Sequence, residues 1–185
     1  MFIQTEQTPN PATLKFLPGK PVLERGVADF TNAPEADRSP LAKRLFAIDG
    51  VAGVFLGKDF ITVTKAPDMD WYALKPTVLG GIMEHYLSGD PAVLADVETE
   101  AEGDVSGEDD EIVRQIKELI ETRVRPAVAQ DGGDITFHGF ERGVVYLNLR
   151  GACAGCPSSV VTLKNGIENL LRYYVPEVSE VRPVA

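Results

Sequence analysis

The sequence predicts an α+β protein built from two small domains, each of which mixes helices and strands. Its 185 residues are 44% hydrophobic and 25% charged, an ordinary globular composition that excludes wholly disordered and fibrous proteins. Short strand-like runs alternate with amphipathic helical runs in both halves. Residues 89–110 hold nine Asp or Glu and no Lys or Arg, and so carry almost all of the net charge of −10. We therefore expect domains at 1–88 and 111–185, separated at 89–110.

The acidic segment 89–110 has few large apolar residues that could offset the entropy lost on ordering. Its like charges repel one another, so we expect a flexible linker. The alternative is a short acidic helix over 91–102, because Ala, Leu and Glu favour helices.

The amino-terminal domain is expected to have the order β-β-α-β-β-α, with its helices on one face of a sheet. Two prolines in the run Thr8-Pro9-Asn10-Pro11 predict the first turn, and Ser39-Pro40 predicts a helix start. Gly57-Lys58-Asp59 predicts the second hairpin turn. The expected elements are strands at 2–5 and 12–17, a helix from 40 to about 48, strands at 51–56 and 60–64, and a helix at 71–87.

No residues of the amino-terminal domain have the spacing of a catalytic site. His85 is expected at the surface or at the edge of the core, and Trp71 and Tyr72 are expected to pack. Gly80-Gly81 in the second helix allows either close packing or a break.

The carboxy-terminal domain is expected to have the order α-β-β-α-β. Its first helix begins near Glu111, and Pro126 either kinks it or starts a second helix. The run from Asp131 to Asp134 predicts a turn, and alternation at Val145, Leu147 and Leu149 predicts a half-buried strand. The remaining expected elements are strands at 135–140 and 144–149, a helix after Pro157, and a strand at 178–181.

The two cysteines, Cys153 and Cys156, lie between an expected strand and an expected helix start. Pro157 suits a first helical turn, where the helix dipole and unsatisfied amides stabilise a thiolate. The neighbouring Ala and Gly residues let the backbone approach a bound group closely. We expect an exposed loop with two sulfur ligands.

Four interpretations compete for this pair. A zinc site needs four ligands, but the chain adds only His85 and His138, neither at zinc-finger spacing. A thioredoxin-type dithiol is the second, and two small buried residues without function are the third. The fourth is an iron–sulfur cluster. A 4Fe-4S cluster needs four thiolates, and two chains related by a two-fold axis would supply them.

Charge and hydropathy exclude other classes of partner. With 18 Lys or Arg against 28 Asp or Glu, the chain lacks the clustered basic residues that nucleic acid binding needs. Its apolar runs are far shorter than the roughly 20 residues that span a bilayer. No secretory signal pattern opens the sequence, so a cytosolic location is expected.

The cysteine motif also resembles a known family. The run from Gly151 to Ser159, with Gln130 to Asp134 upstream, is similar to the NifU-like carboxy-terminal domain of Nfu iron–sulfur carrier proteins. The opening segments Phe2–Glu6, Thr8–Pro11 and Leu14–Phe16 resemble the amino-terminal domain of the same family. The matches fall in both expected domains.

This resemblance implies a carrier and not an enzyme. The carrier would accept a 4Fe-4S cluster, or alternatively a 2Fe-2S cluster, from an upstream assembly scaffold and pass it to apo-proteins. The ligand role falls on Cys153 and Cys156, and the amino-terminal domain would contact client or assembly proteins. The implied location is the bacterial cytoplasm, or the mitochondrial matrix for a mature organellar form.

Two further residues lie near the motif in sequence or in its domain. His138 is expected to be structural and distant from the cysteine loop. Arg150 either balances the negative charge of a bound cluster or is a solvated strand end.

Overall fold

The computed structural model describes residues 1–94, 110–154 and 157–184, and gives the backbone alone for residues 110 and 157–163. The chain divides into two compact units, Met1–Thr99 and Glu100–Ala185. Most of the expected linker, and most of the acidic helix that is its alternative, lies outside the described residues. Residues 91–94 are described and are not helical.

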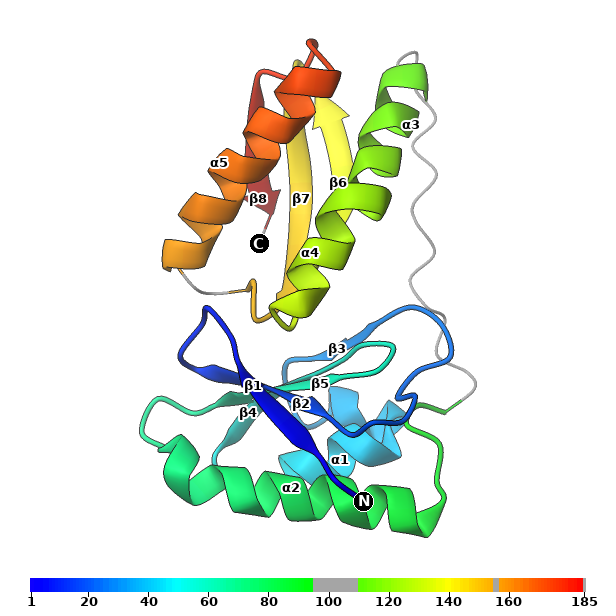
Figure 1. Cartoon of the computed structure of the whole chain (residues 1–185), viewed down its shortest axis with the longest axis vertical. Helices are drawn as coiled ribbons and strands as arrows, with labels where there is room; N and C mark the ends of the chain where they lie inside the picture. Colours follow the sequence, from blue (N-terminus) through cyan, green and yellow to red (C-terminus); the bar gives the residue numbers. More distant parts are fainter. Residues whose placement is uncertain (95–109, 155–156, 185) are drawn as a thin grey trace. The chain divides into compact units, whose positions relative to one another are not determined.

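The first unit is a five-stranded antiparallel sheet with helices on one face (Figure 1). Its strand order is β1-β2-β5-β4-β3. The elements are β1 Gln4–Gln7, β2 Thr13–Leu17, β3 Ala28–Phe30, the 3-10 helix η1 Glu35–Arg38, α1 Pro40–Phe46, β4 Val51–Leu56, β5 Ile61–Lys65 and α2 Trp71–Ser88.

Local signals in the sequence fix the two helices of this unit. The Ser39 hydroxyl accepts a hydrogen bond from the Ala42 amide at 2.9 Å, which caps α1 as expected. A carboxylate oxygen of Asp70 accepts from the Tyr72 amide at 2.9 Å and caps α2. A Cβ added at Gly81 would lie 3.4 Å from the Leu45 side chain of α1, so this glycine allows α1 and α2 to pack closely.

The sequence missed two elements of the first unit, β3 and η1. β3 has only three residues, too few to show alternation, and it forms by pairing antiparallel with the end of β4. The expected α+β class and the expected longer elements are otherwise present. The core between sheet and helices is made of large apolar residues, among them Phe16, Phe30, Leu41, Leu45, Leu56, Ile61, Val63, Val78 and Ile82.

The second unit is a three-stranded sheet, in the order β6-β7-β8, with a core that it shares with its helices. β6 and β7 are antiparallel, whereas β7 and β8 are parallel. The elements are α3 Asp110–Leu119, the π-helical turn η2 Ile120–Val124, α4 Arg125–Gln130, β6 Gly133–Glu141, β7 Val144–Gly151, α5 Pro157–Tyr174 and β8 Glu180–Val184.

Proline explains two departures from regular structure in this unit. Pro126 has no amide hydrogen to donate to the preceding turn, and the Arg125 amide donates instead to the Ile120 carbonyl five residues back, which makes the π-helical turn. The sequence left open a kink or a second helix, and the π turn followed by α4 combines the two. β8 continues through Pro183 to Val184, beyond the expected end at Val181, because an edge strand tolerates a missing amide donor.

Candidate functional site

The cysteine loop lies where the sequence predicts it, between a strand and a helix. β7 ends at Gly151, which has a left-handed φ of 62°, and α5 begins at Pro157. Two backbone hydrogen bonds fold the first half of the loop. The Ala152 amide donates to the Gly132 carbonyl at 3.2 Å, and the Ala154 amide donates to the Gly151 carbonyl at 3.1 Å.

Cys153 is buried, with 2% of its surface exposed, and it belongs to the core of the second unit. Its sulfur lies over Gly133, where an added Cβ would come within 2.4 Å of Sγ. Ala152 is buried too, whereas Ala154 is exposed. The expectation of an exposed loop is therefore wrong at Cys153. A glycine turn leaves room for the thiol to lie inward, and sequence spacing does not reveal such packing.

Cys156 lies outside the described residues. It directly precedes Pro157, the first residue of α5. Its expected ligand role and the expected stabilisation of its thiolate by the start of α5 remain predictions.

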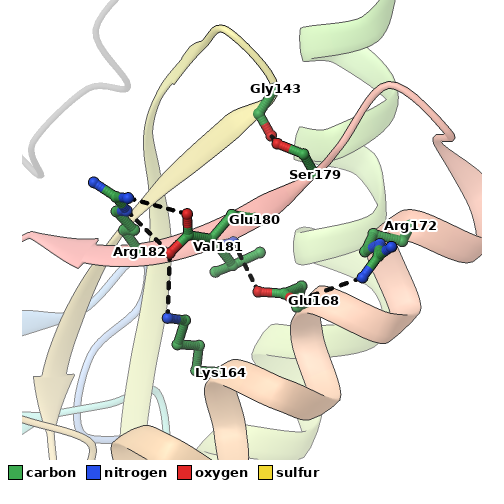
Figure 2. A network of polar contacts seen from close by, with 8 residues as sticks. All are labelled: Gly143, Lys164, Glu168, Arg172, Ser179, Glu180, Val181 and Arg182. Carbon is green, nitrogen blue, oxygen red and sulfur yellow. Dashed lines mark hydrogen bonds and ion pairs between the residues drawn. The ribbon is translucent and has the colours of Figure 1, made fainter.

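The helix that follows the cysteine pair is held against β8 by a polar network (Figure 2). A carboxylate oxygen of Glu168 accepts from the Val181 amide at 3.2 Å, and Arg172 lies 3.8 Å from Glu168. Lys164 and Arg182 reach the Glu180 carboxylate at 3.5 and 3.0 Å. The hydrogen bond from Arg182, with its charge, holds the pKa of Glu180 below its ordinary value. The contacts of Glu168 with Val181 and of Lys164 with Glu180 tie α5 to β8.

The turn between α4 and β6 contacts the cysteine loop through the hydrogen bond from the Ala152 amide to the Gly132 carbonyl. Gly132 has a φ of 79°, which a residue with a side chain rarely adopts, and its amide donates to the Ala129 carbonyl at the end of α4. Gly133 pairs with Gly151 in the β6–β7 ladder. The residues read in the sequence as turn formers thus form the floor under Cys153.

An ion pair beside this turn was not identified from the sequence. Arg125 Nε and Nη2 donate to the two carboxylate oxygens of Asp134 at 2.8 and 2.9 Å, and Arg125 Nη1 donates to Glu121 at 2.6 Å. Burial lowers the pKa of Arg125, but hydrogen bonds and the charges of Asp134 and Glu121 outweigh it and hold the pKa above its ordinary value. No periodic pattern relates a helix residue to a strand residue nine positions later.

The structure places the two histidines in different surroundings. His85 is 2% exposed and lies at the core edge, and among the described residues its Nδ1 has no hydrogen-bond partner. Burial lowers its pKa, with a further lowering by the charge of Arg44. His138 is exposed in β6, at a bulge toward the hairpin end of the strand and away from Gly133. Its distance from the cysteine end of the strand agrees with the prediction.

The remaining expected residues divide. Trp71 packs against Phe16, with 6.3 Å between ring centroids, and its indole donates to the Pro11 carbonyl. Tyr72 is 92% exposed, so its expected packing role is wrong. Arg150 lies opposite Asp134 in the register of the β6–β7 ladder. It is half-buried, which excludes a fully solvated strand end.

Two features of the described residues bear on function. Within residues 1–94, 110–154 and 157–184, no three His, Cys, Asp or Glu side chains lie together as a metal site would require. In the same residues no helix has the length and apolar character needed to cross a bilayer.

Two family profiles match this chain, one in each unit. The first is described as "Scaffold protein Nfu/NifU N terminal" and matches residues 3–89. The second is described as "NifU-like domain" and matches residues 116–182. The two matches cover most of the chain, which therefore belongs to the Nfu/NifU family. The resemblance seen in the sequence is confirmed.

Relatives of high identity extend over nearly the whole chain. The human "NFU1 iron-sulfur cluster scaffold homolog, mitochondrial" is 54% identical over 185 residues, which cover 100% of this chain and 72% of the human protein. The "NifU-like protein 5, mitochondrial" of Arabidopsis thaliana is 56% identical over 184 residues, covering 98% of this chain and 67% of that protein. The solution structure of a NifU-like protein from Saccharomyces cerevisiae is 26% identical, covers 52% of this chain and 87% of its own, and has a TM-score of 0.47.

Proposed function

We propose that this protein is an iron–sulfur cluster carrier, in which Cys153 and Cys156 hold a 4Fe-4S cluster that is passed to apo-proteins. The observation that carries the proposal is the strand-to-helix loop itself. It brings Cys153 to a glycine floor, and Cys156 directly precedes the start of α5. Family membership supports the proposal, as do the relatives, which are named as an iron–sulfur cluster scaffold and a NifU-like protein.

Ligand number points to a shared cluster. A cubane 4Fe-4S cluster takes four thiolates, and the chain has two cysteines in all. A two-fold axis passing through the cluster would bring two thiolates from each of two subunits, which completes the four ligands at the subunit interface. A cluster held at such an interface is open to thiols of an acceptor protein, so ligand exchange is the proposed route of transfer. A 2Fe-2S cluster is the alternative cargo.

Loading must change the surroundings of Cys153. Cys153 is 2% exposed, whereas a cluster shared between two subunits needs its sulfur at the surface. The cysteine has a single side-chain torsion, so a change of rotamer redirects the sulfur. The small side chains of Ala152 and Ala154 offer little obstruction. We expect Cys153 to turn outward as the cluster binds.

The competing proposal is a thiol–disulfide oxidoreductase, in which Cys153 attacks a substrate disulfide and Cys156 resolves the mixed disulfide. Such an attack needs an accessible thiolate, so, like cluster binding, it requires Cys153 to turn outward from its buried position. Reduction of insulin disulfides by iron-free protein would support this rival and contradict the carrier.

The rest of the chain is assigned to recognition and tethering. We propose that residues 1–88 contact client proteins or the upstream assembly scaffold, that residues 89–110 link the domains, and that residues 111–185 hold the cluster. The two compact units and the two profile matches support this division. The relatives are named as mitochondrial, which favours the mitochondrial matrix over the bacterial cytoplasm.

Anaerobic reconstitution followed by transfer tests the function. Protein is loaded with iron and sulfide and mixed with a 4Fe-4S enzyme that has been stripped of its cluster. The acceptor should regain activity, and neither Cys153→Ser nor Cys156→Ser protein should support that recovery. Recovery that is equal with free iron and sulfide alone, or with both variants, would contradict the carrier proposal.

A further inference from the structure

We propose that the ion pair of Arg125 and Asp134 positions the thiol of Cys153 by fixing the glycine turn beneath it. Both residues act on the thiol through the glycine turn, and so they are positioning residues. The inference deepens the proposed function, because the thiol concerned is a proposed cluster ligand. Its principal test needs no iron.

The ion pair has the geometry of a strong interaction. Two guanidinium nitrogens of Arg125 donate to the two oxygens of Asp134 at 2.8 and 2.9 Å. This bidentate arrangement matches the planar fork of arginine, which lysine cannot reproduce. The Asp134 side chain is 5% exposed and that of Arg125 is 25% exposed, so solvent screens the pair weakly. Asp134 therefore has a defined position relative to α4.

The position of Asp134 is passed to the cysteine loop through the two glycines before it. Gly133 is the neighbour of Asp134 in the chain, and the Cys153 sulfur lies against it without room for a Cβ. The Gly132 carbonyl accepts the hydrogen bond of the Ala152 amide. The turn therefore contacts both the thiol of Cys153 and the backbone residue before it.

The ion pair also joins the two ends of the segment that carries the turn. Arg125 is the first residue of α4, and Asp134 lies at the start of β6. The π-helical turn before Arg125 ends where Pro126 interrupts regular hydrogen bonding. Glycine has more backbone freedom than other residues, so the ion pair adds a side-chain restraint to the backbone hydrogen bonds that hold Gly132 and Gly133. The pair spans the segment that contains both glycines.

A purely structural ion pair would alter the stability of the unit without selectively altering Cys153. The two cases differ in the reactivity of the thiol under native conditions. If the pair positions Cys153, breaking it exposes the thiol by local motion, which does not require global unfolding. Alkylation at low denaturant therefore reports on positioning, whereas the unfolding transition reports on stability.

The experiment uses the full chain with Cys156→Ser, which leaves Cys153 as the single cysteine. Iodoacetamide labelling of Cys153 is followed by mass spectrometry in this background and in Asp134→Asn, Arg125→Gln and Arg125→Lys. Asn keeps the size of Asp and removes its charge. Labelling should be faster by roughly ten- to a hundredfold for Asn and Gln, the range expected from losing a charge-assisted hydrogen bond. Lys should give an intermediate rate.

Two controls separate positioning from stability. Glu121→Gln removes a contact of the same Arg125 that is not linked to the turn and should change labelling by less than about twofold. Glu168→Ala weakens α5 against β8 elsewhere in the unit, so its labelling rate should change only as far as its global unfolding free energy requires. Unchanged labelling in Asp134→Asn and Arg125→Gln, or an equal increase in Glu168→Ala at matched stability, would overturn the proposal.

A second measurement connects positioning to the cargo and separates the two proposals. Chains with both cysteines are loaded with cluster, and its loss to an iron chelator is timed by absorbance. Asp134→Asn should lose the cluster faster than the parent chain, while Glu121→Gln should match the parent. If the parent takes up no cluster, the carrier function fails and labelling alone decides the role of the ion pair. Equal loss from parent and Asp134→Asn would overturn the ligand-positioning role.

Discussion

Gly133 lies directly beneath the sulfur of Cys153, so close that an added Cβ would be 2.4 Å from Sγ and 3.0 Å from the Arg150 carbonyl oxygen. The first contact involves a side chain with one torsion, but the second involves backbone. A larger residue at this position must therefore displace the thiol, the β6–β7 ladder, or both.

We predict that Gly133→Ala destabilises the second unit by about 1–3 kcal/mol, the usual range for overpacking, and accelerates labelling of Cys153. Gly139→Ala is the matched control, since it lies in the same strand and has no atom within 4 Å of an added Cβ. Urea unfolding followed by circular dichroism gives the stability. Equal losses in the two variants would show that Gly133 is not closely packed.

The adjacent glycines of α2 should respond in opposite directions. At Gly80 an added Cβ meets nothing within 4 Å, so Gly80→Ala should stabilise the first unit by about 0.5–1 kcal/mol through helix propensity. At Gly81 the neighbours are Ile48 and Leu45, at 3.3 and 3.4 Å, so Gly81→Val should destabilise it. Trp71 is the single tryptophan and lies in this unit, so its fluorescence follows the transition. Destabilisation by both substitutions would contradict the assigned faces.

The buried imidazole of His85 should make the first unit acid-sensitive. Burial, aided by Arg44, lowers its pKa below the ordinary value of about 6.5, against a weaker opposite effect of Asp90. The unfolded state then binds a proton at a higher pH than the folded state. Keeping His85 neutral contributes to the free energy of unfolding of the first unit. This contribution is fully present above about pH 6.5 and falls as the pH drops from there through the folded-state pKa.

Urea midpoints from Trp71 fluorescence should therefore decrease between about pH 7.5 and 5.5, a window above most carboxylate titrations. His85→Phe replaces the imidazole with an apolar ring and should flatten the decrease. An equally steep decrease in His85→Phe would assign the acid sensitivity to other groups.

The contact between Glu168 and the Val181 amide should stabilise the second unit more than the ion pair that Glu168 forms with Arg172. Glu168→Ala leaves an edge-strand amide without its carboxylate acceptor and should cost about 1–3 kcal/mol. Arg172→Ala removes a partner at 3.8 Å and keeps the amide contact, so it should cost at most about 0.5 kcal/mol. Circular dichroism in urea compares them. A larger cost for Arg172→Ala would reverse the ranking.

The sequence predicted the elements whose signals are local. Ser39 caps α1, the turn at Asp131 and Gly132 precedes β6, and Pro126 interrupts the helix, because each acts on the few residues beside it. β3 escaped prediction because its three residues become a strand only by pairing with β4. β8 runs past Pro183 for a similar reason, since the adjacent strand β7 supports it.

For the site, the sequence predicted that Cys153 follows a strand and precedes a helix, and it missed the surroundings of that cysteine. The ion pair of Arg125 and Asp134 depends on how a helix start approaches a strand start, and the burial of Cys153 depends on space above Gly133. Both are properties of packing between elements. Tyr72 shows that residue type alone does not predict burial. It is exposed to solvent, whereas the adjacent Trp71 packs on Phe16.

Iron and sulfide analysis of anaerobically loaded protein, combined with its mass by light scattering, tests the central claim most directly. The account predicts about 4 iron and 4 sulfide per two chains, with dimers that appear on loading and disappear when the cluster is removed. A monomer that holds a complete cluster by itself, or protein that binds none under strictly oxygen-free conditions, would contradict it.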